Sequence, residues 1–65
     1  MYKVFFKDCF LGQEDTYSKA VTIAWNYASS INLEFSKEIK QPFGRIALIF
    51  CDQNREEYFI ITKGE

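Results

Sequence analysis

The sequence predicts a small α+β domain spanning residues 1–65, in which a single helix packs on a three- to four-stranded, mostly antiparallel sheet. Three observations lead to this prediction. An alternating apolar run begins the chain, a stretch with helical spacing of apolar residues follows it, and two strand-like runs around a polar loop come last. The expected order is β-α-(β)-β-β, in which the strand in parentheses has a helix as its alternative.

The first strand is expected in residues 2–10, YKVFFKDCF, where apolar and polar side chains alternate. The face richer in apolar side chains would carry Tyr2, Val4, Phe6 and Phe10. Gly12 interrupts this run, and the polar residues after it include several that favour a helix N-terminus. We therefore expect a helix to begin near Asp15 or Thr16.

Residues 16–31 have the i, i+3, i+4, i+7 spacing of an amphipathic helix. The apolar positions on its main face are Tyr17, Ala20, Val21, Ala24, Ala28 and Ile31. The bulkier residues Ile23, Trp25 and Tyr27 widen that face, while the opposite side carries small polar groups. Asn32 is expected to end the helix.

Residues 33–40, LEFSKEIK, alternate in a way that predicts a short amphipathic strand. A helix is the alternative, because Lys37 breaks the alternation and eight residues are too few to decide by periodicity. The residues that follow, Gln41-Pro42-Phe43-Gly44, predict a turn, since proline fixes φ and glycine accepts a positive φ.

Residues 45–51, RIALIFC, are nearly all apolar, which is typical of a strand covered on both faces and predicts the centre of the sheet. After a polar loop at residues 52–55, residues 56–63 return as the partner of this strand in a β-hairpin. Tyr58, Ile60 and Thr62 would share one side of the final strand, and Phe59 and Ile61 the other.

The composition limits the chemistry available to the chain. It has no histidine, which excludes Ser-His and Cys-His nucleophilic arrangements and the commonest zinc sites. Its three glycines are isolated, so no phosphate-binding loop is present, and its acidic residues fall on predicted polar faces or turns. We expect no catalytic residues, no cofactor and no metal, and hence a protein that is not an enzyme.

Charge and cysteine content bear on partners and location. Eight Lys or Arg against nine Asp or Glu give a formal net charge of −1, so no net field draws the chain to a polyanion. The run from Met1 enters a strand at once, without a secretory signal, and no apolar stretch reaches the roughly 18 residues of a membrane span. A cytoplasmic protein with no membrane partner and with Cys9 and Cys51 reduced is expected.

One helix can cover only one face of the sheet, and the opposite face is also apolar. It would present Phe5, Cys9, Ala47, Ile49, Cys51 and either Phe59 with Ile61 or Tyr58 with Ile60. Because soluble monomers seldom expose a large apolar patch, we interpret this face as a surface for protein binding or self-association. The alternative is that residues 33–44 or the chain ends fold back over it. The residues expected to carry the binding are Phe5, Lys7, Ile49, Tyr58 and Phe59.

The function predicted from these observations is non-catalytic protein binding by steric occupation of a partner's surface. In size and character, though by no motif, the chain is comparable with the small modulators that phages and mobile elements use against host proteins. One alternative is single-stranded nucleic-acid binding, in which aromatic rings on the open sheet stack with bases beside Lys3, Lys7, Arg45 and Arg55. Another is a structural or assembly subunit that forms a homodimer.

Overall fold

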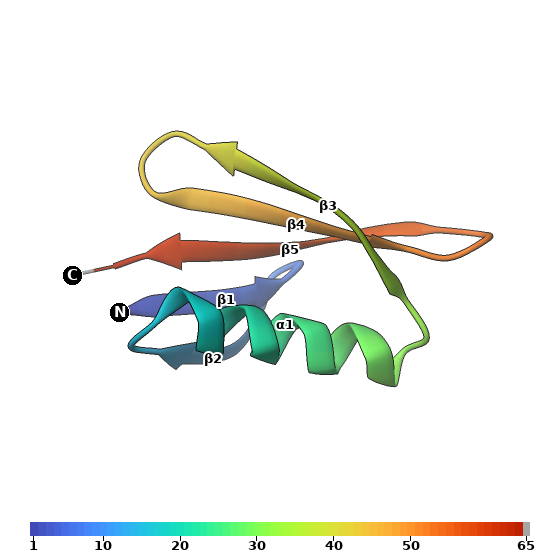
Figure 1. Ribbon diagram of the computed structural model, residues 1–65, viewed down its shortest axis with the longest axis horizontal. Helices are drawn as coiled ribbons and strands as arrows, with labels where there is room; N and C mark the ends of the chain where they lie inside the picture. The colour runs from blue at the N-terminus through green and yellow to red at the C-terminus, as the bar shows by residue number, and fades with distance from the viewer. Residues whose placement is uncertain (65) are drawn as a thin grey trace.

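The computed structural model describes residues 1–64, which form five strands and one helix (Figure 1). In chain order these are β1 (Tyr2–Phe6), β2 (Cys9–Glu14), α1 (Tyr17–Ser30), β3 (Glu34–Gln41), β4 (Arg45–Cys51) and β5 (Glu56–Lys63). The α+β class is confirmed. The predicted three to four strands were too few, because the N-terminal run contains two strands instead of one.

The N-terminal run bends back on itself at Lys7 and Asp8. Lys7 has a φ of 55°, in the left-handed region, and Phe6 pairs with Cys9 across the turn. Neither glycine nor proline marks this reversal, so the local sequence does not distinguish it from a continuous strand. The resulting hairpin brings Phe10 beside Phe5, although the sequence had placed Phe10 on the face of Val4.

All pairs in the sheet are antiparallel, and the strand order is β2-β1-β5-β4-β3. The predicted hairpin of residues 45–63 is confirmed as β4 and β5, and residues 34–41 form a strand paired with β4. The central strand is β5, not β4 as expected, because β1 pairs with the free edge of β5. At the end of this pair, the Gly64 N–H donates to the Met1 carbonyl at 2.7 Å.

Both ends of α1 are formed by local side-chain and backbone chemistry. The Thr16 hydroxyl caps the N-terminus by accepting from the Lys19 N–H at 3.3 Å. At the C-terminus Asn32 has a φ of 63° and its N–H donates to the Ser29 carbonyl. The Leu33 N–H donates to the Ala28 carbonyl at 2.9 Å, which completes a Schellman motif. These caps confirm the predicted helix limits.

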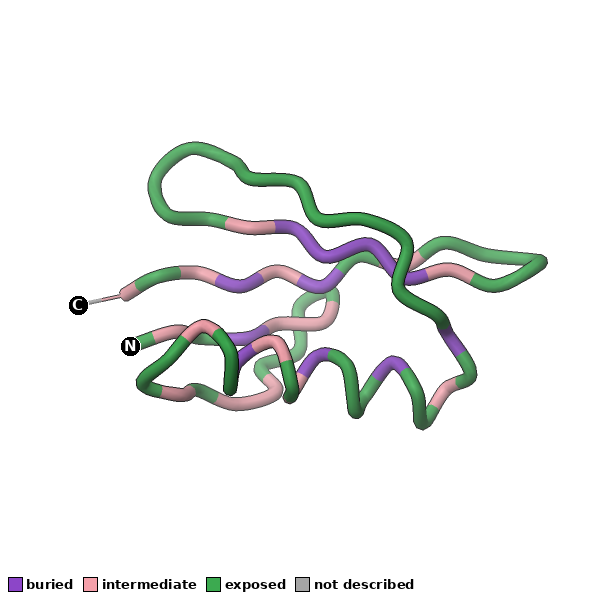
Figure 2. The backbone as a smooth tube through the Cα atoms, in the orientation of Figure 1, coloured by how far each residue is buried: buried purple, intermediate pink, exposed green. Residues whose placement is uncertain are grey.

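The helix packs on one face of the sheet, mainly across β1 and β2 (Figures 1 and 2). Ala20, Ala24 and Ala28 lie at intervals of four residues, are completely buried and let the helix approach the strands closely. A Cβ added at Gly12 on β2 would lie 3.2 Å from Ile23 Cδ1. The strand side of this core comprises Val4, Leu48, Phe50, Phe59 and Ile61, with Leu33 at the end of the helix.

Strand β3 contains a β-bulge that changes the direction of its side chains. Phe35 pairs with Phe50 and Lys37 pairs with Ile49, so Ser36 is an extra residue in this strand. Phe35 therefore lies on the helix side, where its ring stacks on Trp25 at a centroid distance of 5.1 Å. Beyond the bulge, Ile39 pairs with Ala47 on the opposite face. Strict alternation along residues 33–40, LEFSKEIK, would have placed Phe35 and Ile39 on one face.

The second face of the sheet is not covered by any element of residues 1–64. Residues 33–44, the alternative cover for this face, instead extend the sheet at its edge, where every residue of β3 is exposed (Figure 2). The helix lies on the other side (Figure 1).

Candidate protein-interaction surface

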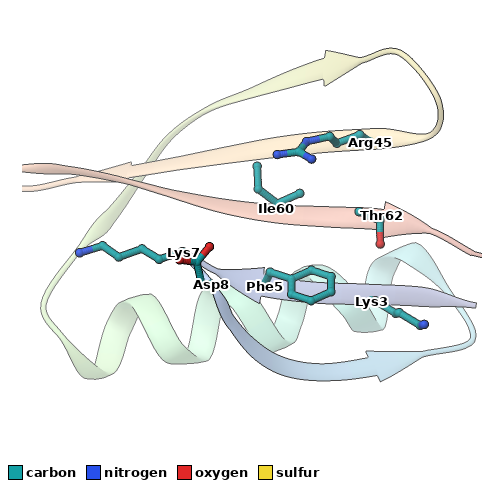
Figure 3. Close-up of a pocket in the computed structure, with 7 residues that line it drawn as sticks. All are labelled: Lys3, Phe5, Lys7, Asp8, Arg45, Ile60 and Thr62. Atoms are coloured by element: carbon teal, nitrogen blue, oxygen red, sulfur yellow. The ribbon is translucent and has the colours of Figure 1, made fainter.

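The face turned away from α1, which we name the open face, receives alternate side chains from all five strands. Residues directly opposite each other in paired strands share a face, so the registers define rows across the sheet. One row is entirely apolar and crosses every strand, in the order Phe10, Phe5, Ile60, Ala47 and Ile39. Figure 3 shows Phe5 and Ile60 of this row side by side, with the helix behind the sheet.

Several apolar side chains of the open face are strongly exposed. The exposed fractions are 52% for Phe10, 49% for Tyr58 and 39% for Ile39, while Phe5 and Ile60 are half-buried. The rings of Phe5 and Phe10 meet edge to face at a centroid distance of 5.5 Å. The fold alone does not require this apolar area, because the core lies on the other side of the sheet.

Two small or branched residues form the floor of the open face. Ala47 and Ile49 are each 1% exposed even though no element covers them. Ile49 lies between Tyr58 and Lys37, and Ala47 between Ile60 and Ile39, so larger neighbours on the same face shield both. A partner would bury little additional area on Ile49, which therefore supports the surface without anchoring a partner.

Apart from Lys37, which pairs with Ile49, the charges on the open face separate toward its two ends. Lys3 and Arg45 stand in one row with Thr62 between them, beside the apolar row. Glu34 and Glu56 stand in the row at the opposite end, on either side of Cys51. Among residues 1–64, none of these four charged side chains takes part in a salt bridge. The face is thus basic at one end and acidic at the other.

A hollow of about 570 Å³ lies over the basic end, and Figure 3 shows the residues around it: Lys3, Phe5, Lys7, Asp8, Arg45, Ile60 and Thr62. The described residues bring no three metal-ligating side chains together there or elsewhere. Toward the acidic end, the Tyr58 hydroxyl donates to Glu56 Oε1 at 3.2 Å, and this bond raises the pKa of Tyr58. Tyr58 therefore remains a neutral hydrogen-bond donor at physiological pH.

The structure places the five sequence-predicted binding residues in different environments. Phe5, Ile49 and Tyr58 lie on the open face. Phe59 does not, because its completely buried ring stacks on Phe6 at 4.6 Å beneath the helix. Lys7 turns toward the helix side, where its Nζ lies 3.3 Å from Glu57 Oε2. Of the two open-face pairs that the sequence left possible, Tyr58 with Ile60 is the one observed.

The open face also contains two exposed residues that sequence reasoning missed, Phe10 and Ile39. Neither glycine nor proline marks the reversal that brings Phe10 to this side. For Ile39 a signal was present, because the break in alternation at Lys37 is where the bulge shifts the register. Cys9, expected on this face, pairs with Phe6 and so belongs to the helix side.

The comparisons with known proteins found no relative of this chain. Within residues 1–64 the single helix is too short and too polar to cross a membrane. No protein-family model matches the chain, and no match was found among the curated proteins or among the solved structures.

Proposed function

We propose that this protein is a non-catalytic protein-binding module that engages its partner through the open face and acts by steric occupation. The observation that carries the proposal is the apolar row from Phe10 to Ile39, which crosses all five strands and has no cover among residues 1–64. A partner whose catalytic or assembly surface is covered by this face would be blocked without any chemistry, in the manner of a small phage-type inhibitor.

The side chains of the open face suit a protein partner. Phe10 and Tyr58 offer large rings that are about half exposed, and Tyr58 adds a hydrogen-bonding group. Aromatic residues of this kind supply much of the energy in protein interfaces. Glu34 and Glu56 on the same face favour a protein over a nucleic acid, since carboxylates repel phosphates.

The test is to truncate single exposed rings and measure partner capture from the native cell. Phe10→Ala and Tyr58→Ala should each weaken binding by about 2 kcal/mol, close to thirtyfold. Phe43→Ala is the matched control, because Phe43 is fully exposed at the β3–β4 turn, outside the rows of the open face. Circular dichroism verifies that each variant folds.

Two results would count against the proposal. Unchanged capture by both open-face variants would show that the partner binds elsewhere. An affinity that falls steeply and linearly with the logarithm of salt concentration would instead indicate phosphate contacts, and hence a nucleic acid on this face.

A further inference from the structure

The open face is complementary in charge to itself. Along β4 its rows follow in the order Arg45, Ala47, Ile49 and Cys51, two residues apart. The Arg45 row carries Lys3 and Arg45, and the Cys51 row carries Glu34 and Glu56. The two rows between them are mostly apolar. This pattern of positive, apolar, apolar and negative rows is complementary to its own reverse, because each positive row then faces a negative row.

We propose that the partner on the open face is a second copy of this chain, so that the protein forms a face-to-face homodimer. This inference rests on the proposed function and names the partner for that same surface. The two-fold axis would run across the strands, between the rows of Ala47 and Ile49. Each copy then lays its Arg45 row on the Cys51 row of the other, with the same patch used by both copies.

Charge selects this orientation over the other two-fold arrangement. With the axis across the strands, Arg45 of one copy faces the Glu34 and Glu56 side chains that flank Cys51 in the other. With the axis along the strands, Lys3 and Arg45 would face Lys3 and Arg45, and like charges opposed across an interface are strongly unfavourable. Lys37 lies on the edge strand β3, from which its long side chain can reach solvent.

The area of the face predicts a dimer that dissociates on dilution. Five strands about 4.8 Å apart are about 19 Å wide, and the six steps from Arg45 to Cys51 along β4, at about 3.4 Å each, are about 20 Å long. The flat area is therefore about 400 Å² per copy. A standard interface buries about 800 Å² per partner, which is more than this face provides even when the uneven surface of its side chains is included. A second copy supplies a surface of equal size, so the whole face can be used.

The inference is tested with two charge reversals on opposite ends of the open face. Arg45→Glu and Glu56→Arg each place like charges against each other at two symmetric positions of the dimer. Each variant alone should dissociate at a concentration about tenfold or more higher than the wild type. In an equimolar mixture every reversed charge meets an opposite charge, so the mixture should regain dimers close to the wild-type strength.

Sedimentation velocity over a concentration series, from micromolar to millimolar, measures these equilibria. Lys40→Glu is the matched control, because Lys40 lies on β3 but pairs with Ile46 on the helix side, so its reversal should leave the dimer unchanged. A wild-type protein that stays monomeric throughout overturns the inference, as does a dimer that neither open-face variant weakens. If the protein is monomeric but Phe10→Ala and Tyr58→Ala still lose a different captured protein, the proposed function stands without this inference.

Discussion

Tyr58 and Phe59 are adjacent on β5 with side chains on opposite faces, so truncating each to alanine should have very different effects on stability. Phe59 is completely buried against Phe6 and Phe50, and a Phe→Ala change in such a core costs about 3–5 kcal/mol. Tyr58 is 49% exposed. Its buried half, about 100 Å², contributes at most about 2.5 kcal/mol at about 25 cal/mol per Å².

The consequence depends on total stability, which for a chain of 65 residues is about 3–10 kcal/mol. Phe59→Ala should therefore lose between about a third and all of this free energy of unfolding, and Tyr58→Ala should remain folded with a lower urea midpoint. Fluorescence of Trp25, the single tryptophan, follows the transition because its ring stacks on Phe35 and touches Phe50. If Tyr58→Ala destabilised the protein as much as Phe59→Ala, the assignment of the β5 side chains to the two faces of the sheet would be wrong.

Two further predictions concern the β3–β4 turn and high pH. Phe43 is fully exposed yet has a φ of 64°, which costs a bulky residue about 1–2 kcal/mol, so Phe43→Asn should raise the free energy of unfolding. Gly44→Ala should lower the free energy of unfolding, because Gly44 has a φ of 71°. Urea unfolding measures both variants, and a change of the same sign in both would contradict this reasoning. Burial, together with the hydrogen bond to Glu38, raises the pKa of Tyr17 above its ordinary value of 10.0. The stability contributed by the protonated Tyr17 hydroxyl is therefore full below pH 10.0 and is lost as pH rises beyond it. Urea midpoints measured across that range should decline less in Tyr17→Phe, and an identical decline would exclude Tyr17 as a cause.

The helix and the C-terminal hairpin could be predicted because their signals are local. Thr16 and Asn32 cap the helix with their own side chain or backbone, and the alanines between them report the buried face. The hairpin of β4 and β5 follows from two apolar runs around a polar loop. Each of these features can be recognised within a window of about 18 residues.

Sheet order and the exact members of the open face could not be predicted, because they depend on pairing between distant residues. The reversal at Lys7 uses no glycine, so alternation along residues 2–10 predicts one strand, with Phe10 on the face of Val4, where the structure has a hairpin. The choice between Tyr58 and Phe59 required the register of β5 against β1 and β4. That an apolar face would remain uncovered could be anticipated from the presence of a single helix.

The added Ser36 divides β3 into two parts that are out of phase with each other. Ahead of it, Phe35 meets Trp25, while after it Ile39 points to the opposite side and Lys40 takes the helix side. Deletion of this one residue would reverse the orientation of every side chain on one part of the strand at once. A change in chain length at this site can therefore create or remove a contact surface while the chemical character of every remaining residue stays the same.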